Sequence, residues 1–200
     1  MAIVTKALLL LLLCICAHAE RIICIGDSIT QGGARADDYS YRLPLQSMVK
    51  ADFIGTQHAG LDPSMKWPDG FDPDHEGYYG ATTAQVRERL KESLPKLPAP
   101  DIALIYLGTN DRPGETVGPL EEIVGELRAK NPMVRVYIGL LPGDGWRRVV
   151  SRLLVRGMAS RLRVAAVPPS YGKADTYDGV HPNPSGQMKM ARAWYAALTG

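Results

Sequence analysis

Five short apolar runs, rich in β-branched residues, alternate along the chain with segments whose apolar residues recur every three or four positions. The runs cover 21–26, 52–55, 101–107, 134–141 and 163–167. Within them polarity does not alternate, which is typical of strands covered on both faces in a parallel sheet. We therefore predict five parallel strands with helices between them.

Four segments have apolar positions spaced for one face of a helix. Their apolar residues are Val86, Leu90 and Leu94; then Leu120, Ile123, Val124 and Leu127; then Val149, Val150, Leu153, Leu154 and Met158; and, in a last helix over about 185–198, Met188, Ala191, Trp194, Tyr195 and Leu198. Alternation of strands and helices predicts an α/β fold, a three-layer α/β/α sandwich. In such folds functional groups gather at the carboxyl ends of the strands.

The stretch 56–80 interrupts this alternation with closely spaced glycines and prolines, among which lie Trp67, Phe71, Tyr78 and Tyr79. Loops of this length inside a domain are usually functional, so we interpret it as a wall of a substrate cleft. The alternative is a surface excursion whose aromatic rings only pack it down.

The amino-terminal segment has a composition of its own. Lys6 precedes an unbroken apolar run over 7–17, which ends in the small-x-small sequence Ala17-His18-Ala19. This pattern predicts a secretory signal peptide over 1–19, cut before Glu20, with a single domain over 20–200. The apolar run is short for a membrane span, although a retained anchor is the alternative. We expect a secreted protein, extracellular or periplasmic, that has no contact with membrane after cleavage.

Composition narrows the possible partners. Loss of Lys6 with the leader lowers the net charge from +2 to +1, which predicts no binding to nucleic acid. Cleavage also removes two of the three cysteines and leaves Cys24, which we place in a buried strand without a disulfide partner. His75 lies between Asp74 and Glu76, but metal sites need three or more convergent ligands, so we expect no metal and no cofactor.

Four short motifs follow one another at predicted strand ends or in the loops after them. They are Gly-Asp-Ser-Ile-Thr at 26–30, Gly-Tyr-Tyr-Gly at 77–80, Gly-Thr-Asn-Asp at 108–111 and Asp-Gly-Val-His-Pro at 178–182. Ser28 directly follows the first strand, as a nucleophile would, although a serine there also suits a turn or an N-cap. The chain has no Gly-x-Ser-x-Gly motif, so a nucleophile elbow does not carry this serine.

The other motifs supply the groups that a serine nucleophile needs. His181 is a candidate general base, and Asp178, three residues earlier, is placed to orient its ring. The Asn110 amide and the Gly80 backbone are candidate oxyanion donors, together with Ser28. An Asx-turn is the alternative role for Asn110, and Gly77 competes with Gly80.

These motifs together resemble those of the SGNH hydrolases of the GDSL esterase/lipase superfamily, and the resemblance extends over 20–200. Within that superfamily the chain is most similar to carbohydrate esterase family three, the secreted acetyl xylan esterases. That closer likeness rests on 26–30, 41–43, 52–56, 74–77 and 178–182. It departs from the family in one place, because Ala81 follows Gly80 where an aromatic residue is common.

The resemblance implies a flavodoxin-like sheet, a Ser28–His181–Asp178 triad, and an oxyanion hole of Ser28, Gly80 and Asn110. It also implies acetylated polysaccharide as the substrate, and we place Arg42, Trp67, Tyr78 and Tyr79 in contact with it. Two alternatives stay open: an arylesterase, thioesterase or lysophospholipase of the same superfamily, or an inactive carbohydrate-binding module on this scaffold. Nothing in the sequence indicates an oligomeric state.

Overall fold

A parallel β-sheet runs through the middle of the protein, which is described by a computed structural model over residues 19–143 and 146–200. The strands are β1 (Glu20–Gly26), β2 (Ala51–Ile54), β3 (Glu76–Gly77), β4 (Ile102–Tyr106), β5 (Arg135–Gly139) and β6 (Ala165–Val167). The main strand order is β2-β1-β4-β5-β6, and β3 pairs with the carboxyl end of β1, beyond the point where β2 stops. Without β3 this is the flavodoxin-like order, as predicted.

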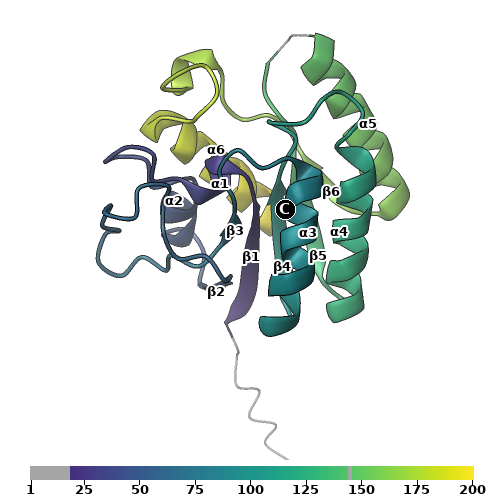
Figure 1. Cartoon of the computed structure of the whole chain (residues 1–200), viewed down its shortest axis with the longest axis horizontal. Helices are drawn as coiled ribbons and strands as arrows, with labels where there is room; N and C mark the ends of the chain where they lie inside the picture. The colour runs from purple at the N-terminus through teal and green to yellow at the C-terminus, as the bar shows by residue number, and fades with distance from the viewer. Residues whose placement is uncertain (1–18, 144–145) are drawn as a thin grey trace, which may run out of the picture.

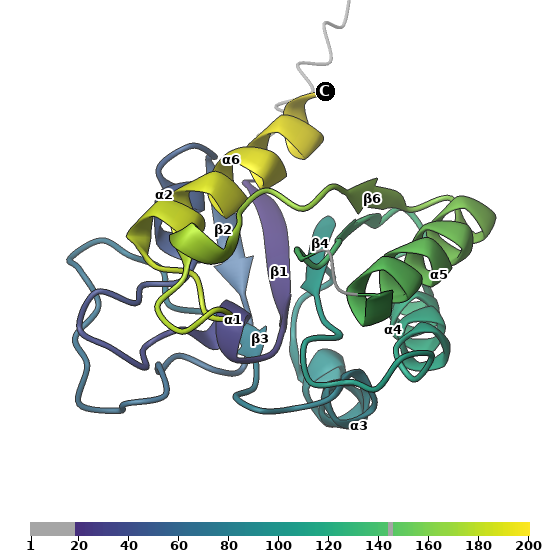
Figure 2. The same cartoon turned by 90° about the horizontal axis from the view of Figure 1, so that it is seen from above.

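Helices cover both faces of the sheet (Figures 1 and 2). They are α1 (Ser28–Gln31), α2 (Arg42–Gln46), α3 (Thr83–Ser93), α4 (Val117–Lys130), α5 (Trp146–Leu162) and α6 (Pro184–Thr199), with 3₁₀ turns η1 (Leu94–Lys96) and η2 (Lys173–Asp175). Apolar residues of α3, α4 and α5 pack on one face, and those of α1, α2 and α6 pack on the other. The predicted three-layer α/β/α sandwich is confirmed.

The two faces of β1 show why its sequence is apolar throughout. Ile23 and Ile25 join the core beneath α3, α4 and α5, whereas Ile22 and Cys24 join the core beneath α2 and α6. Successive side chains of a strand point to opposite faces, so a strand covered twice has no polar face. Cys24 is a fully buried free cysteine, as expected from its place in this run.

Helix ends follow their sequences closely. Thr82 and Gln85 form a reciprocal capping box at the start of α3. Asn183 accepts from two backbone N–H groups at the start of α6, where Pro184 occupies the first helical position. These caps determine where each helix begins beside the carboxyl edge of the sheet.

The structure corrects the predicted buried faces of two helices. Among the α5 side chains that the structure describes, Val155, Met158 and Ala159 are buried, so Met158 was predicted correctly, whereas Leu153 and Leu154 are 61% and 43% exposed. The side chain of Val150 falls outside the described residues. On α6 Ala191 and Trp194 are buried as predicted, together with Met190, whereas Met188 and Tyr195 are 37% and 40% exposed. On both helices the predicted buried face included apolar residues that are exposed to solvent.

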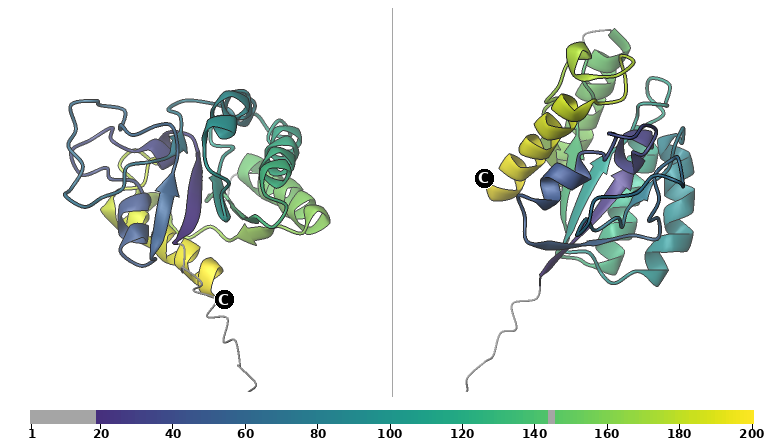
Figure 3. Two further views of the ribbon diagram at one scale, coloured as in Figure 1. Left: turned by 90° about the horizontal axis from the view of Figure 1, so that it is seen from below. Right: turned by 90° about the vertical axis from the view of Figure 1, so that its left-hand side faces the viewer.

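The predicted loop at 56–80 lies beside α2, beyond the β2 edge of the sheet, and is interrupted by β3 (Figures 1 and 3). An isolated bridge between Gln57 and His75 closes its base. The predicted signal peptide, except for Ala19, falls outside the described residues. Over 19–143 and 146–200, no helix combines the length and the apolar character that a membrane crossing requires.

Candidate active site

Ser28 lies at the carboxyl end of β1, where the chain turns at once into the short helix α1. The turn is tight enough to require glycine at position 26, because a Cβ there would lie 2.1 Å from the Thr30 hydroxyl and 2.8 Å from the Tyr106 carbonyl oxygen. The N-cap role considered for Ser28 belongs instead to Asp27, whose carboxylate accepts from the Ile29 N–H at 3.0 Å. The Ser28 hydroxyl is therefore left for another partner.

That partner is His181, in the loop that leads to α6. Ser28 Oγ lies 3.0 Å from His181 Nε2, and His181 Nδ1 lies 2.7 Å from Asp178 Oδ2. A ring that donates from Nδ1 to the carboxylate presents an unprotonated Nε2 to the hydroxyl. This geometry is what general-base activation of a serine requires.

The Asp178 carboxylate is held by its own loop. Its Oδ1 accepts from the backbone N–H groups of Val180 at 3.0 Å and His181 at 2.8 Å. Partial burial raises the pKa of Asp178, but the hydrogen bonds from His181 and Val180 outweigh that effect and bring the pKa to about 2. The group that faces the imidazole is thus a carboxylate at any pH near neutrality.

Two further N–H donors come from neighbouring loops. The Asn110 Nδ2 donates to the Ala81 carbonyl at 3.0 Å, so one amide hydrogen anchors the side chain and the other is left for a ligand. Gly80 has φ +69° and open space where a Cβ would lie. Gly77, the competing candidate, is buried in β3, and its N–H donates to His75 Nδ1 at 2.9 Å.

Hydrogen bonds connect these donor loops to the rest of the site. The Tyr78 N–H donates to the Gly26 carbonyl at 3.0 Å, which fixes the second motif against the end of β1. The Asp111 carboxylate accepts from both the N–H and the hydroxyl of Thr83, so the third motif is fixed to the start of α3. Asn110 therefore sits on a loop that is held at both ends and does not use its side chain to close its own turn.

Tyr79 is the predicted substrate contact that lies at this site. Its ring is 51% exposed and stacks beside His181, with centroids 6.1 Å apart and planes inclined by 3°. Its backbone N–H donates to Gln31 Oε1 at 2.8 Å. Gln31 was not singled out from the sequence, because a lone glutamine in a short helix gives no recognisable signal.

Arg42, predicted to contact the substrate, is fully buried. Its guanidinium donates to the carbonyl oxygens of Thr30 at 2.9 Å, Gln31 at 3.0 Å and Pro73 at 2.7 Å. Burial lowers its pKa to about 10, which leaves it charged at neutral pH. Arg42 therefore has a structural role, because it ties α1 to the loop before β3 and cannot reach a substrate.

Trp67 and Tyr78 are also turned toward the protein. The Trp67 ring packs on Phe71 with centroids 5.1 Å apart, lies 5.4 Å from the Arg42 guanidinium, and donates its indole N–H to the His58 carbonyl. Tyr78 is half-buried against the core and donates its hydroxyl to Glu76 at 2.5 Å. These two aromatic rings pack the loop down, as the alternative interpretation of 56–80 expected, and only Tyr79 lies beside the histidine.

Asp27 is a fully buried carboxyl group beside the nucleophile, and no sequence pattern singled it out. Burial raises its pKa to about 6, and the nearby Thr109 hydroxyl offsets part of that rise. Yet neither Asp27 Oδ2 nor Thr109 Oγ1 has a hydrogen-bond partner of normal geometry among the described residues. The residue next to the nucleophile is therefore incompletely satisfied.

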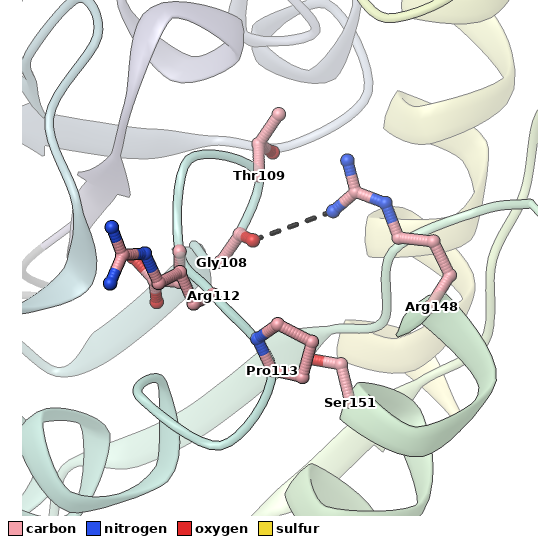
Figure 4. Close-up of a pocket in the computed structure, with 7 residues that line it drawn as sticks. Gly108, Thr109, Arg112, Pro113, Arg148 and Ser151 are labelled. Carbon is pink, nitrogen blue, oxygen red and sulfur yellow. Dashed lines mark hydrogen bonds between the residues drawn. The ribbon is translucent and has the colours of Figure 1, made fainter. Parts of the chain in front are cut away.

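Two cavities open beside these groups. One, of about 170 Å³, is lined by Ile29, Thr109, Tyr171, Gly179 and Val180 among others. The second, of about 180 Å³, is lined by Gly108, Thr109, Asp111, Arg112, Pro113, Arg148 and Ser151 (Figure 4). Both have substantial polar linings, and Thr109 and Arg148 contribute to each. No cluster of three or more metal-ligating side chains occurs within the described ranges.

A family match and a curated relative both relate this chain to ester-hydrolysing proteins. The model of the GDSL-like Lipase/Acylhydrolase family matches residues 24–189. The chain is 26% identical, over 92% of its length, to a multidomain esterase from Ruminococcus flavefaciens, of which it spans only 29%.

Similar solved structures include carbohydrate esterase family 3 proteins from Talaromyces cellulolyticus and from Clostridium thermocellum. The first has a TM-score of 0.73 at 22% identity and covers 90% of this chain and 96% of that one. The second has a TM-score of 0.72 at 23% identity and covers 90% and 99%. At this level of identity the likeness establishes a shared fold.

Proposed function

Given that this chain belongs to the GDSL-like lipase/acylhydrolase family and is a hydrolase of the esterase type, we propose that it removes acetyl groups from xylan or a related acetylated polysaccharide through an acyl-enzyme. One observation carries the proposal: the hydrogen-bonded series from Ser28 Oγ through the His181 ring to the Asp178 carboxylate. Each member lies at the distance that its role requires.

In the first half of the reaction, Ser28 Oγ attacks the carbonyl carbon of the acetyl ester while His181 Nε2 takes the hydroxyl proton. Asp178 stabilises the imidazolium that results. Collapse of the tetrahedral intermediate breaks the bond between the carbonyl carbon and the sugar oxygen. His181 donates the proton to that oxygen, so a free sugar hydroxyl leaves and an acetyl group remains on Ser28.

In the second half, water attacks the acetyl carbon and gives its proton to His181. Acetate then leaves, and the proton returns to Ser28 Oγ. In both halves negative charge builds up on the carbonyl oxygen. The Ser28 and Gly80 N–H groups and the free hydrogen of Asn110 Nδ2 are the donors proposed to stabilise it.

Tyr79 supports a carbohydrate substrate. An exposed aromatic ring beside the base offers a flat apolar face on which a sugar ring can stack, and its hydroxyl remains available for hydrogen bonding. The polar cavities on either side of Arg148 suit a hydroxyl-rich ligand better than a long acyl chain. The carbohydrate esterases that share the fold agree with this choice.

An acetylated polysaccharide is too large to cross a cell membrane intact, so we also propose that the protein is exported, with 1–19 as a cleaved leader. The apolar run over 7–17 and the Ala17-His18-Ala19 sequence support this. Sequencing the amino terminus of protein recovered from the medium or the periplasm tests it. A mature chain that begins at Glu20 is the expected result, and an intact leader would contradict it.

The substrate class is tested by measuring acetate release from acetylated xylan alongside hydrolysis of 4-nitrophenyl acetate, butyrate and octanoate. We expect acetate release and a preference for the shortest acyl chain. Ser28→Ala should abolish both activities, whereas Ser47→Ala, at an exposed position, should abolish neither. A preference for octanoate without release from xylan would favour a lipid esterase. A wild type inactive on every ester would leave only a binding role.

A further inference from the structure

Arg148, in the first turns of α5, has an unusual position among the cations near the site. Its side chain reaches across the cavity toward the loop after β4, where Nη1 lies 3.4 Å from the Gly108 carbonyl oxygen (Figure 4). That single long contact uses little of a guanidinium's five-donor capacity. Within 19–143 and 146–200, no carboxylate forms an ion pair with Arg148.

Neighbouring arginines of α5 are engaged differently. Arg152 donates at short range to the carbonyl oxygens of Leu141 and Gly143, and Arg161 is paired with Glu121. These contacts use the side chains to brace the chain. Arg148 is half-buried and directed into open space that its neighbours do not fill.

The charges around the larger cavity leave it positive. Arg112 and Arg148 both line it, with Asp111 as the third charged lining residue, and in Figure 4 the Arg112 guanidinium points away from Arg148. The Asp111 oxygens already accept from the Thr83 N–H at 2.8 Å and the Thr83 hydroxyl at 2.5 Å. The Arg148 donors that remain would suit an anionic group brought by a ligand.

Arg148 also connects this cavity to the reaction centre. It lines the smaller cavity together with Ile29, which follows the nucleophile, and with Gly179 and Val180, which lie between Asp178 and His181. Thr109, adjacent to Asn110, lines both cavities. A group bound by Arg148 would therefore lie beside the ester that Ser28 attacks.

We propose that Arg148 is a specificity-determining residue that binds the carboxylate of an acidic sugar neighbouring the acetylated one. The inference rests on the proposed function and deepens it: the preferred substrate is an acetylated polysaccharide that carries uronic acid residues. Arginine suits this task because its planar fork can donate two parallel hydrogen bonds to a carboxylate.

The test uses two matched substrates: an acetylated oligosaccharide with a uronic acid next to the acetyl group, and the same compound with the carboxylate converted to a carboxamide. The measured quantity is the ratio of kcat/KM for the acid to kcat/KM for the amide. We expect wild type to favour the acid, and Arg148→Gln to lower the ratio about tenfold, the range of a lost charge-assisted hydrogen bond. Arg148→Lys should retain part of the preference, because it keeps the charge without the fork.

Arg156→Gln is the matched control, since Arg156 is an exposed arginine two turns further along α5. It should leave the ratio unchanged, which excludes a general effect of lost positive charge. Thermal unfolding of each variant shows whether the fold survives. A ratio near one in wild type, or an equal loss for both substrates in Arg148→Gln, would overturn the proposal.

A binding measurement separates this inference from the esterase assignment. Calorimetry with Ser28→Ala, which cannot turn over an ester by the proposed route, should show tighter binding of the acid than of the amide. Adding Arg148→Gln should remove that difference. If Arg148→Gln removes the difference in binding between acid and amide but the wild type hydrolyses no ester, only the esterase proposal is contradicted. Inorganic phosphate competing more strongly than the acidic oligosaccharide would show a general anion site and overturn the inference.

Discussion

The ring of Tyr79 lies parallel to the imidazole of His181, with the two planes inclined by only 3° and the centroids 6.1 Å apart. The backbone of Tyr79 is held by Gln31, three residues after the nucleophile. The segment that positions the serine therefore also positions the aromatic ring beside the base. A substrate stacked on Tyr79 would be placed by the same short helix that presents Ser28.

Tyr79→Ala should raise KM for acetylated xylan about tenfold and alter kcat less, because it removes a stacking surface and no reacting group. Tyr79→Phe keeps the ring and should stay close to wild type. The measurement is initial rate against polysaccharide concentration. An effect confined to kcat would mean that the ring acts on His181 instead of on the sugar.

Asn110→Ala should lower kcat by about 10²–10³ with KM within a few-fold of wild type, because an oxyanion donor acts mainly on the transition state. Since Asn110 Nδ2 also binds the Ala81 carbonyl, unfolding should be followed in parallel. Asp111→Asn, at the adjacent position, is the comparison, and it should affect stability more than kcat. A pure KM effect in Asn110→Ala would make this side chain a binding group.

Asp178→Asn should lower kcat by roughly 10⁴, because an amide that donates to Nδ1 favours the wrong tautomer of His181. The pKa of Asp178 in the folded protein is about 2, below its ordinary value. The stabilisation from this carboxylate is therefore complete above its unfolded pKa and is lost only as the pH falls toward 2. Any loss of kcat/KM at mildly acidic pH should then come from a group other than the Asp178 carboxylate. A variant that matches wild type across the pH range would show that Ser28 and His181 act as a dyad.

Asp27→Asn should raise the melting temperature at pH 7 but not at pH 4. Burial raises the pKa of Asp27 to about 6, so between about pH 4 and 6 the folded protein holds a proton that the unfolded chain has released, and at pH 7 the folded protein carries a buried charge. Stability contributed by this group is complete below the unfolded pKa of about 4 and is lost as the pH rises through 6. Asparagine keeps an oxygen for the Ile29 N–H and carries no charge. An equal shift at both pH values would mean that burial of the charge is not the cause.

Arg42→Met should destabilise the fold by about 3–5 kcal/mol, because it leaves three buried carbonyl oxygens without their donor. Arg42→Lys should be destabilised less than Arg42→Met but more than wild type, since a single ammonium group cannot reach all three carbonyl oxygens that the guanidinium binds. Chemical denaturation measures both variants. A raised KM with unchanged stability would instead support the substrate-binding role that the sequence analysis predicted for Arg42.

The parallel sheet could be predicted because strands such as β4 are apolar on both faces, a pattern that amphipathic helices and half-exposed strands do not produce. Its flavodoxin-like order was implied by the family resemblance. β3 was missed, since its two residues, Glu76 and Gly77, carry no strand signal and pair only because the chain passes the end of β1. The buried face of α5 was predicted incorrectly at Leu153 and Leu154, because these residues follow helical spacing while exposed to solvent. Helical spacing of apolar residues indicates an apolar face, but it does not show which of those residues another element covers.

The candidate site shows the same division. Ser28, Asp178 and His181 could be proposed from motif order, because each motif falls at a strand end or in the loop after it. Arg42 could not be placed, since a buried arginine satisfied by carbonyl oxygens looks like an exposed one in sequence. Gln31 and Arg148 belong to no motif, so only the three-dimensional structure shows that they lie near the site.

Ser28 and His181 are separated by 153 positions yet share one hydrogen bond. During synthesis the ribosome adds the nucleophile well before the base. Fragments that leave the ribosome before the base is added have the serine but lack the histidine. A nascent chain would thus be unable to cleave esters by this route until the segment that carries His181 has been synthesised and has folded against Ser28.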